Sequence, residues 1–177
     1  MVSTVIPVPS FDLVIFGGTG DLARRKILPS LYRRLKVGQV PPEARIIAAA
    51  RSEMSSEDYR ASVRASFEEF LEPALRDDAA IESFLASLHY VRIDATGEAG
   101  WPELAARLGE RPDNARAFYL SVAPSLFGEI ATRLAESGVV SRSCRIVIEK
   151  PLGHDLASAR ALNASFAKHF DEAQIYR

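Results

Sequence analysis

The stretch Asp12-Leu-Val-Ile-Phe-Gly-Gly-Thr-Gly-Asp-Leu-Ala23 decides the fold. Its first five residues form a short, mainly apolar run that ends in glycine, which is typical of a buried strand. The glycine-rich part opens a helical pattern that extends to Val37, in which apolar residues from Leu28 to Leu35 share one face. A strand, a tight glycine turn and a helix in this order predict the first unit of a parallel sheet.

Strand-like and helix-like segments alternate along the rest of the chain. The expected strands are residues 12–16, 45–50, 89–93, 117–122, 145–148 and 174–176. This alternation requires a parallel sheet that is covered on both faces. We therefore expect residues 1–177 to form one α/β domain, a Rossmann-like doubly wound parallel sheet with helices on both faces. Because the sixth strand has barely begun at Arg177, we also expect the chain to be part of a longer protein.

Local signals predict where several helices begin and end. Pro29 lies inside the first helical pattern and should kink or divide that helix, because proline has no backbone N–H. Gly38 and Gly138 are expected to end helices. Ser55, with Asp58 three residues later, predicts a helix that begins with a capping box.

Composition excludes several classes of function. The 177 residues include 22 Lys and Arg against 23 Asp and Glu, a net charge of -1, which argues against nucleic-acid binding driven by bulk charge. The single cysteine, Cys144, excludes an intrachain disulfide and a cysteine-based zinc site, and we predict no metal site. No apolar run is long enough to span a membrane, and residues 1–10 carry no basic signal region. We expect a cytoplasmic protein without a membrane partner.

The glycine turn predicts a dinucleotide site. Gly18, Gly20 and Ala23 fit the G-x-G-x-x-G/A pattern that follows the first strand of dinucleotide-binding domains. One glycine supplies a positive φ for the tight turn, another leaves room for the pyrophosphate, and the small Ala23 lets helix and strand pack closely. The pyrophosphate would lie at the helix N-terminus, where backbone N–H groups are free.

The end of the second strand bears on the choice between NAD and NADP. An NAD site places Asp or Glu there to bind the ribose 2′-hydroxyl, whereas this chain has Arg51 and Ser52. A guanidinium binds a 2′-phosphate through charge-assisted hydrogen bonds, so we predict NADP as the cofactor. Glu53 is the nearest acid and would serve NAD if the strand ended two residues later.

A second cluster, Glu149-Lys-Pro-Leu-Gly153, follows the fifth strand. Ligands of open α/β sheets bind outside the carboxyl ends of the strands, so Lys150 is well placed for a phosphate or a sugar hydroxyl. From position alone, a binding role and a solvated surface role for Lys150 are equally supported.

These motifs together resemble a known family. Residues 17–23, followed by Lys26 and Pro29, are similar to the G-x-x-G-D-L-A-x-x-K-x-x-P signature of the glucose-6-phosphate dehydrogenases. Residues 149–153 resemble that family's E-K-P-[FL]-G, and residues 119–124 resemble its fourth-strand segment. The resemblance covers the whole chain in the same order and spacing.

The resemblance implies NADP-dependent oxidation of D-glucose 6-phosphate to 6-phospho-D-glucono-1,5-lactone, the first step of the oxidative pentose phosphate pathway. It implies that Arg51 binds the 2′-phosphate and that Asp94 and Ala95 line the adenosine side. Lys26 would lie near substrate and cofactor, and Lys150 would contact the substrate and the nicotinamide end. The cofactor pyrophosphate would be held by the turn residues Gly17, Gly18, Thr19, Gly20, Asp21, Leu22, Ala23 and Arg24.

One departure from the family pattern limits what this chain is expected to do. The family's substrate motif would begin at Arg177, and its general-base histidine and its α+β substrate and dimerisation domain would follow. We therefore expect no catalytic residue in this chain, and we expect it to bind NADP without turnover. The full-length protein is expected to be a homodimer or homotetramer whose interface lies mostly outside the chain.

Two other functions are compatible with an NADP-binding fold. The first is a free-standing NADP-binding sensor module without catalysis, although such a sensor has no need for Lys26 and Lys150. The second is another NADP-dependent sugar reductase or epimerase, which often carries a Tyr-x-x-x-Lys pair. None of the five tyrosines has a lysine four residues later, which argues against the second function.

Overall fold

The computed structural model describes residues 8–149 and 156–177. Its strands lie in the order β3-β2-β1-β4-β5-β6, and every neighbouring pair is parallel. This is the doubly wound order, in which the chain reverses direction across the sheet between β1 and β4. The expected fold class is therefore confirmed. The strands are β1 (Phe11–Phe16), β2 (Arg45–Ala50), β3 (Leu88–Arg92), β4 (Ala115–Leu120), β5 (Arg145–Ile148) and β6 (Ile175–Tyr176).

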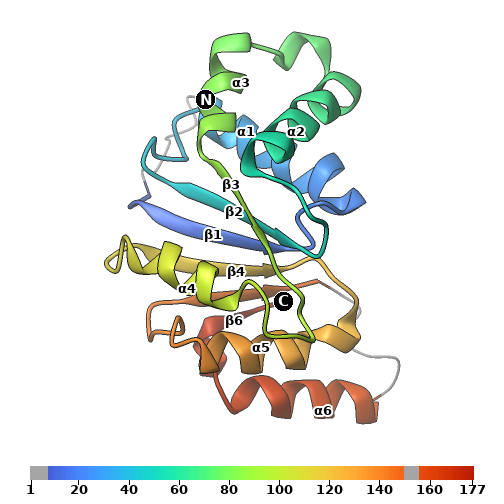
Figure 1. Cartoon of the computed structure of the whole chain (residues 1–177), viewed down its shortest axis with the longest axis vertical. Helices are drawn as coiled ribbons and strands as arrows, with labels where there is room; N and C mark the ends of the chain where they lie inside the picture. The colour runs from blue at the N-terminus through green and yellow to red at the C-terminus, as the bar shows by residue number, and fades with distance from the viewer. Residues whose placement is uncertain (1–7, 150–155) are drawn as a thin grey trace, which may run out of the picture.

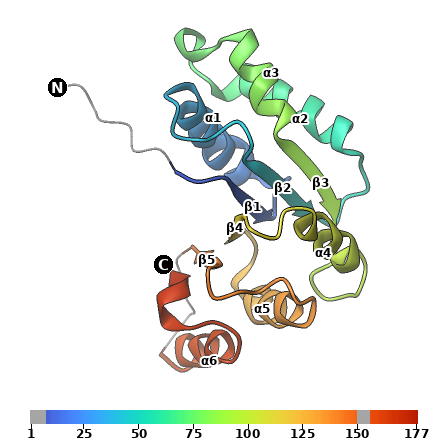
Figure 2. The same ribbon diagram turned by 90° about the vertical axis from the view of Figure 1, so that its left-hand side faces the viewer.

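Helices cover the two faces of the sheet (Figures 1 and 2). One face packs against α1 (Leu28–Lys36), α2 (Ser56–Phe70) and α3 (Asp78–Ala86). The other packs against α4 (Trp101–Gly109), α5 (Phe127–Glu136) and α6 (Leu156–Ala167). Four short helical turns complete the described elements: η1 (Ala23–Ile27), η2 (Pro73–Leu75), η3 (Pro124–Leu126) and η4 (Glu172–Gln174).

The central strand β1 shows why its sequence is a continuous apolar run. Leu13 and Ile15 join the hydrophobic core under α1–α3, whereas Val14 and Phe16 join the core under α4–α6. Side chains alternate between the faces of a strand, so a strand that is covered on both sides must be apolar at every position. This double burial holds the carboxyl end of β1, and the glycine turn that follows it, on a rigid base.

The first helical pattern is divided, as expected from Pro29. Residues 23–27 form the π-helical turn η1, in which the N–H of Leu28 donates to the carbonyl oxygen of Ala23. The regular helix α1 then starts at Leu28, with Pro29 in its first turn. Proline cannot donate to the preceding turn, and the chain accommodates it by one wider turn before the regular helix.

Most other expected boundaries are confirmed to within one or two residues. Ser55 caps α2, and its side chain and that of Asp58 form the predicted reciprocal hydrogen bonds. The fourth strand is displaced: it spans Ala115–Leu120 rather than residues 117–122. Ser121 still donates to the carbonyl of Phe16 at 2.9 Å, after which the chain leaves the sheet. Cys144 is fully buried.

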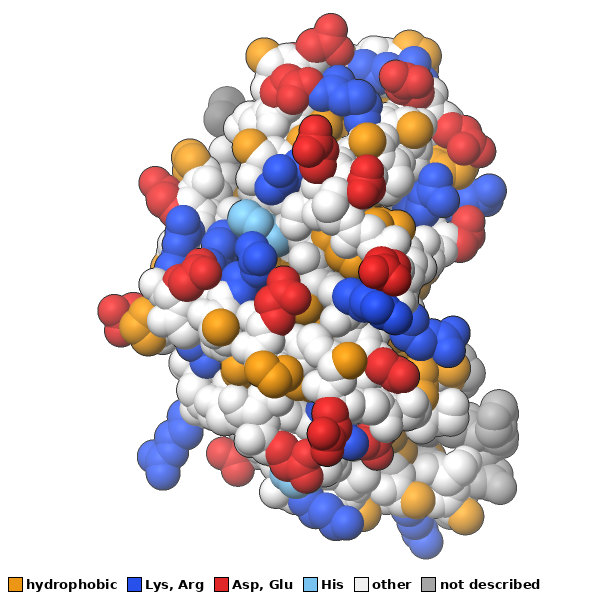
Figure 3. Space-filling view, in the orientation of Figure 1, with side chains coloured by type: hydrophobic (Ala, Val, Ile, Leu, Met, Phe, Trp, Pro, Cys, Tyr) orange, Lys and Arg blue, Asp and Glu red, His pale blue; other side chains and the backbone are white. Residues whose placement is uncertain are grey.

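No helix within residues 8–149 and 156–177 combines the length and the apolar character needed to cross a bilayer. On the face shown in Figure 3, acidic and basic side chains are interspersed over the surface. This distribution agrees with the balanced charge of the sequence.

Candidate functional site

A cavity of about 410 Å³ opens at the carboxyl edge of the sheet. It lies where β1 to β4 end, which is where open α/β sheets bind their ligands. In Figure 3 the surface is hollowed at the right-hand edge, on the side to which the strands of Figure 1 point, and basic side chains project beside the hollow. The cavity is lined by Phe16, Gly17, Thr19, Gly20, Ala49, Ala50, Arg51, Ser52, Ile93, Asp94, Ala95, Thr96, Ser121, Val122, Ala123, Leu126 and Ile130.

The tight turn at the start of this cavity depends on Gly17. This residue has a φ of +82°, and a Cβ added to it would lie 2.0 Å from the carbonyl oxygen of Ser121. Both the conformation and the space exclude any other residue. The motif predicted that one glycine of the turn has a positive φ without specifying which one, and in the structure this residue is Gly17.

Gly18 and Gly20 are needed for two different reasons. A Cβ on Gly18 would lie 2.5 Å from the Cβ of Ala48, so this glycine lets the turn pack against β2. Gly20 lines the cavity, and among the described atoms an added Cβ would meet only the carbonyl oxygen of Gly17, at 3.0 Å. The missing side chain of Gly20 therefore leaves the backbone open to a ligand. An anionic pyrophosphate fits this position, next to the start of the first helical segment.

Arg51 lies in the same cavity as the glycine turn. It is exposed, it follows the last residue of β2, and Ser52 lines the cavity beside it. Glu53 is not among the described residues that line the cavity, and its carboxylate lies 3.5 Å from the guanidinium of Arg92. The acid that would have favoured NAD is thus directed elsewhere, and the basic and hydroxyl groups that suit a 2′-phosphate remain at the cavity.

Asp94 and Ala95 line the cavity from the segment that follows β3. Asp94 Oδ1 accepts hydrogen bonds from the backbone N–H of Thr96 at 3.0 Å and from its hydroxyl at 2.9 Å. These hydrogen bonds, with a contribution from the nearby Arg51, hold the pKa of Asp94 below its usual value. An ionised Asp94 is suited to accept hydrogen bonds from ribose hydroxyls or an amino group.

The structure places other predicted residues outside this cavity. Ala23 is fully buried under the turn, and Gly18 packs against β2. Asp21 and Arg24 line a small depression with Arg25, which forms a 2.8 Å ion pair with Asp21. Lys150 lies outside the described residues. The structure thus brings together Gly17, Thr19, Gly20, Arg51, Asp94 and Ala95.

Lys26 lies in a separate cavity of about 300 Å³, which Leu22 also lines. This cavity contains Tyr119 from β4 and Glu149, the residue that follows β5. The Tyr119 hydroxyl donates to the Glu149 carboxylate, and burial together with this bond raises the pKa of Tyr119. Lys26, which belongs to η1, thus lines the same cavity as Tyr119 of β4 and Glu149 after β5.

The described residues that line the main cavity include no histidine. His89 lies on β3 with its Nδ1 3.1 Å from a guanidinium nitrogen of Arg107. His169 lies 3.3 Å from the hydroxyl of Thr132. Neither ring is placed to take a proton from a ligand in the cavity.

Sequence reasoning did not select the residues that line the cavity after β4. Ser121, Val122 and Ala123 do so, together with Leu126 and Ile130 farther along the chain. A signal for the first three was available, since they directly follow a strand and ligands bind at the carboxyl ends of strands. Leu126 and Ile130 carried only the apolar pattern of a helix that packs on the sheet.

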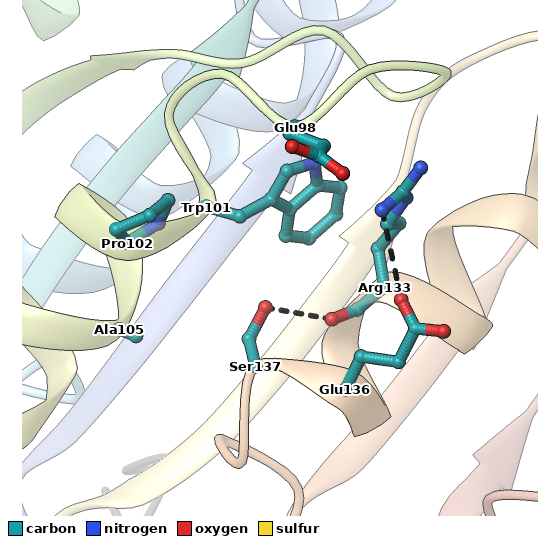
Figure 4. Close-up of a pocket in the computed structure, with 7 residues that line it drawn as sticks. All are labelled: Glu98, Trp101, Pro102, Ala105, Arg133, Glu136 and Ser137. Carbon is teal, nitrogen blue, oxygen red and sulfur yellow. Dashed lines mark hydrogen bonds and ion pairs between the residues drawn. The ribbon is translucent and has the colours of Figure 1, made fainter.

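A further cavity of about 340 Å³ lies between α4 and α5 and is shown in Figure 4. Its floor is Trp101, whose ring is buried and stacks on Phe16. Arg133 is paired with Glu136 at 3.6 Å and with Glu129 at 3.1 Å, and Ser137 donates to the carbonyl oxygen of Arg133. Arg133 is thus engaged by the two glutamates of its own helix, and we assign no ligand to this groove.

Comparison with known proteins places the chain among relatives of one family. The family model described as "Glucose-6-phosphate dehydrogenase, NAD binding domain" matches residues 14–177. The glucose-6-phosphate 1-dehydrogenase of Rhizobium meliloti (strain 1021) is 45% identical over 177 residues, which are 100% of this chain and 36% of that protein. The one from Mycolicibacterium smegmatis is 42% identical over 98% of this chain and 36% of the relative. The chain thus spans about a third of the length of these curated relatives.

Solved structures give the same result. A glucose-6-phosphate dehydrogenase in complex with its substrate glucose-6-phosphate superposes with a TM-score of 0.84 at 31% identity, over 100% of this chain and 37% of that one. The glucose-6-phosphate 1-dehydrogenase from Mycobacterium avium has a TM-score of 0.81 at 36% identity, over 94% of this chain and 36% of that one. The fold, the glycine turn and these relatives together show that the chain belongs to the glucose-6-phosphate dehydrogenase family, of which it carries the NAD-binding domain.

Proposed function

We propose that the cavity at the carboxyl edge of the sheet binds NADP. The turn around Gly17 and Gly20 would hold the pyrophosphate, Arg51 and Ser52 the 2′-phosphate, and Asp94 and Ala95 the adenosine side. The bound cofactor supplies a nicotinamide ring that accepts a hydride. In this proposal the residues of this chain bind and orient the cofactor.

One observation carries the choice of NADP. Arg51 lies in the cavity with the glycine turn, while the acid that would suit the 2′-hydroxyl of NAD, Glu53, is paired with Arg92 outside it. A carboxylate at the ribose would repel a 2′-phosphate, whereas a guanidinium forms charge-assisted hydrogen bonds with it.

We further propose that the domain serves oxidation of D-glucose 6-phosphate at C1 to 6-phospho-D-glucono-1,5-lactone. The name that the relatives share supports this reaction over a free-standing NADP sensor. Lys26 would bind the substrate from the cavity that it shares with Tyr119 and Glu149. Lys150, two positions after the end of β5, is proposed to reach the substrate and the nicotinamide end.

We propose that residues 1–177 supply the cofactor part of this enzyme. Removal of a hydride from C1 requires a base that takes the hydroxyl proton, and such a base must lie within hydrogen-bond reach. The described lining of the cavity offers no histidine for this step. The 177-residue chain with NADP and glucose 6-phosphate is therefore expected to form only trace NADPH, and substantial NADPH formation would contradict this assignment.

The decisive experiment for the cofactor compares two arginine variants by calorimetric titration with NADP and NAD. Arg51→Asp should weaken NADP binding about ten- to hundredfold, because a charge-assisted contact contributes roughly 1.5–3 kcal/mol. Its effect on NAD should be much smaller. Arg142→Asp makes the same change of charge at an exposed loop residue beyond the main cavity and should alter neither affinity. Equal losses of NADP and NAD affinity in Arg51→Asp would show that Arg51 does not bind the 2′-phosphate.

A further inference from the structure

Two tyrosines from different elements meet behind the cavity. Tyr59 comes from α2 and Tyr90 from β3, and both side chains are buried, with 1% and 4% of their surface exposed. Their ring centroids are 5.4 Å apart with 33° between the planes. Neither residue lines the cavity, yet each hydroxyl is bonded to the backbone of a cavity loop.

Tyr59 is bonded to the glycine turn. Its hydroxyl donates to the carbonyl oxygen of Gly18 at 2.8 Å. The same turn is tied to β2, since the N–H groups of Gly17 and Gly18 donate to the carbonyl oxygen of Ala49 at 2.8 and 3.3 Å. The turn is therefore held from the sheet on one side and from α2 on the other.

Tyr90 is bonded to the segment that carries Arg51. Its hydroxyl lies 2.5 Å from the carbonyl oxygen of Ser52 and 3.1 Å from that of Ala50. The single proton of this hydroxyl is shared between carbonyl oxygens on both sides of Arg51, with the shorter bond to Ser52. The carbonyl oxygen of Arg51 also accepts from Arg92 at 3.3 Å, but that guanidinium is largely exposed.

Both hydroxyls remain donors over the working pH range. Burial raises the pKa of Tyr59 and the pKa of Tyr90. The Tyr59 and Tyr90 rings are in contact, and because a buried aromatic pair has little freedom to shift, the two side chains form one rigid unit.

We infer that Tyr59 and Tyr90 are positioning residues that set the separation between the glycine turn and the Arg51 segment. This separation determines whether one dinucleotide can place its pyrophosphate on the turn and its 2′-phosphate on Arg51 at the same time. Tyr90 acts on the 2′-phosphate end and so on the discrimination between NADP and NAD. Tyr59 acts on the turn, which both cofactors share. The inference rests on the proposed function of the cavity.

The test measures the dissociation constants of NADP and NAD for the 177-residue chain and for Tyr59→Phe and Tyr90→Phe. Each variant removes one hydroxyl and keeps the ring, so the core packing is retained. Tyr90→Phe should lower the preference for NADP about three- to tenfold while NAD binding changes less than about twofold. Tyr59→Phe should weaken both cofactors by a similar factor and leave their ratio unchanged.

Tyr32→Phe is the matched control. Tyr32 is fully buried, and its hydroxyl donates to the carbonyl oxygen of Leu75 at 2.9 Å, which lies outside the cavity. The control should lower the melting temperature by an amount similar to the other two variants and leave both dissociation constants unchanged. A change in the NADP-to-NAD ratio cannot come from a general loss of stability, so this ratio separates positioning from a structural role.

A double-mutant cycle completes the test. In the background of Arg51→Ala, the effect of Tyr90→Phe on the cofactor ratio should disappear, because Tyr90 acts through the segment that carries Arg51. If the unaltered chain prefers NADP and Tyr90→Phe shifts the ratio no more than Tyr32→Phe does, the inference is overturned and the proposed cofactor stands. If the unaltered chain binds neither cofactor, the proposed function fails and this inference fails with it.

Discussion

The two ends of the sheet use charged residues differently. At the amino ends of β1 and β2, Arg45 donates to both carboxylate oxygens of Asp12, at 2.7 and 2.9 Å, and both residues are buried. Arg45 also donates to Glu110 Oε2 at 2.7 Å, and Asn114 Nδ2 donates to Asp12 Oδ1 at 3.2 Å. At the opposite edge of the sheet, Arg51 after β2 and Asp94 after β3 are exposed and line an open cavity.

The two edges differ because the charged residues at the amino end are paired with each other, whereas those at the carboxyl end face the cavity. The bond with Asp12 raises the pKa of Arg45 further, and the pair joins adjacent strands in register. At the other end, the hydroxyls of Tyr59 and Tyr90 bind backbone carbonyls and leave the charged side chains facing the cavity. Paired charges at the amino end contribute to stability. At the carboxyl end, Arg51 and Asp94 form no ion pair among the described residues and are available for a ligand.

The largest effect is expected from disrupting the Asp12–Arg45 pair at the amino end of the sheet. Arg45→Met leaves the Asp12 carboxylate buried without its main partner, and it should lower the free energy of unfolding by about 3–5 kcal/mol. Urea titration monitored by circular dichroism measures the loss. The cofactor affinity of the folded fraction should be unchanged, since the pair does not line the cavity.

Two further variants test whether the loss of stability comes from the unpaired Asp12 carboxylate. Glu110→Gln changes the exposed partner of Arg45 and should cost less than about 1 kcal/mol. The double variant Asp12→Leu with Arg45→Met removes both charges and should be more stable than Arg45→Met alone. A double variant less stable than Arg45→Met would contradict the view that the cost comes from an unpaired buried carboxylate.

A smaller effect on stability is expected from disrupting the glycine turn at the carboxyl end of the sheet. Gly17→Ala forces a side chain into a left-handed conformation and against the carbonyl oxygen of Ser121, so it should cost about 1–3 kcal/mol of unfolding free energy. Because the turn must move, NADP affinity should fall at least about tenfold. Calorimetric titration and thermal unfolding measure the two effects separately.

Gly38→Ala is the matched control for this variant. Gly38 has a φ of +74°, but among the described atoms nothing lies within 4 Å of an added Cβ, and the residue follows the end of α1. It should cost about 1–2 kcal/mol of stability. NADP affinity should stay the same, and a loss as large as that of Gly17→Ala would break the link between the turn and the cofactor.

The smallest expected effect concerns pH at the amino end. Burial, with the nearby Arg107, lowers the pKa of His89 to about 4 from its ordinary value of 6.5. Between these values the unfolded chain binds more protons, so the free energy of unfolding falls as pH decreases from about 6.5 to about 4. The loss should be about 1 kcal/mol, reduced by solvent screening because His89 is only half-buried.

His89→Gln checks this contribution. The variant removes the titrating group, so its stability should depend less steeply on pH between 6.5 and 4 than that of the unaltered chain. Urea midpoints at several pH values in this interval give the slope. Identical slopes for both chains would show that His89 does not contribute to the acid sensitivity.

Elements with a local signal were predicted well from the sequence. Pro29 marked the division of the first helix because proline lacks a donor, and Ser55 with Asp58 marked the start of α2 because a capping box needs only four residues. The fourth strand was misplaced by two residues, since apolar residues continue past its end. Ser121, Val122 and Ala123 leave the sheet there and line the cavity.

The candidate site was predicted in part. Motif spacing pointed to the glycine turn and Arg51, because each follows a strand and parallel strands end at the same edge. Asp94 and Ala95 were implied only by the family resemblance. Motif spacing did not show that Gly17 rather than Gly18 has the positive φ, or that Arg24 and Lys26 line other cavities. Those outcomes depend on which atoms surround each residue after folding.

The sequence by itself determined the class of fold, the sheet edge that carries the candidate site and the basic residue that follows the second strand. Apolar periodicity, glycine spacing and the presence of Arg51 in place of an acid are local properties that can be identified from the sequence alone. Only the tertiary structure decided that Asp12 pairs with Arg45, and that Tyr59 and Tyr90 support both cavity loops from behind. These contacts join residues more than 30 positions apart, and strand register and helix packing alone bring them within hydrogen-bond distance.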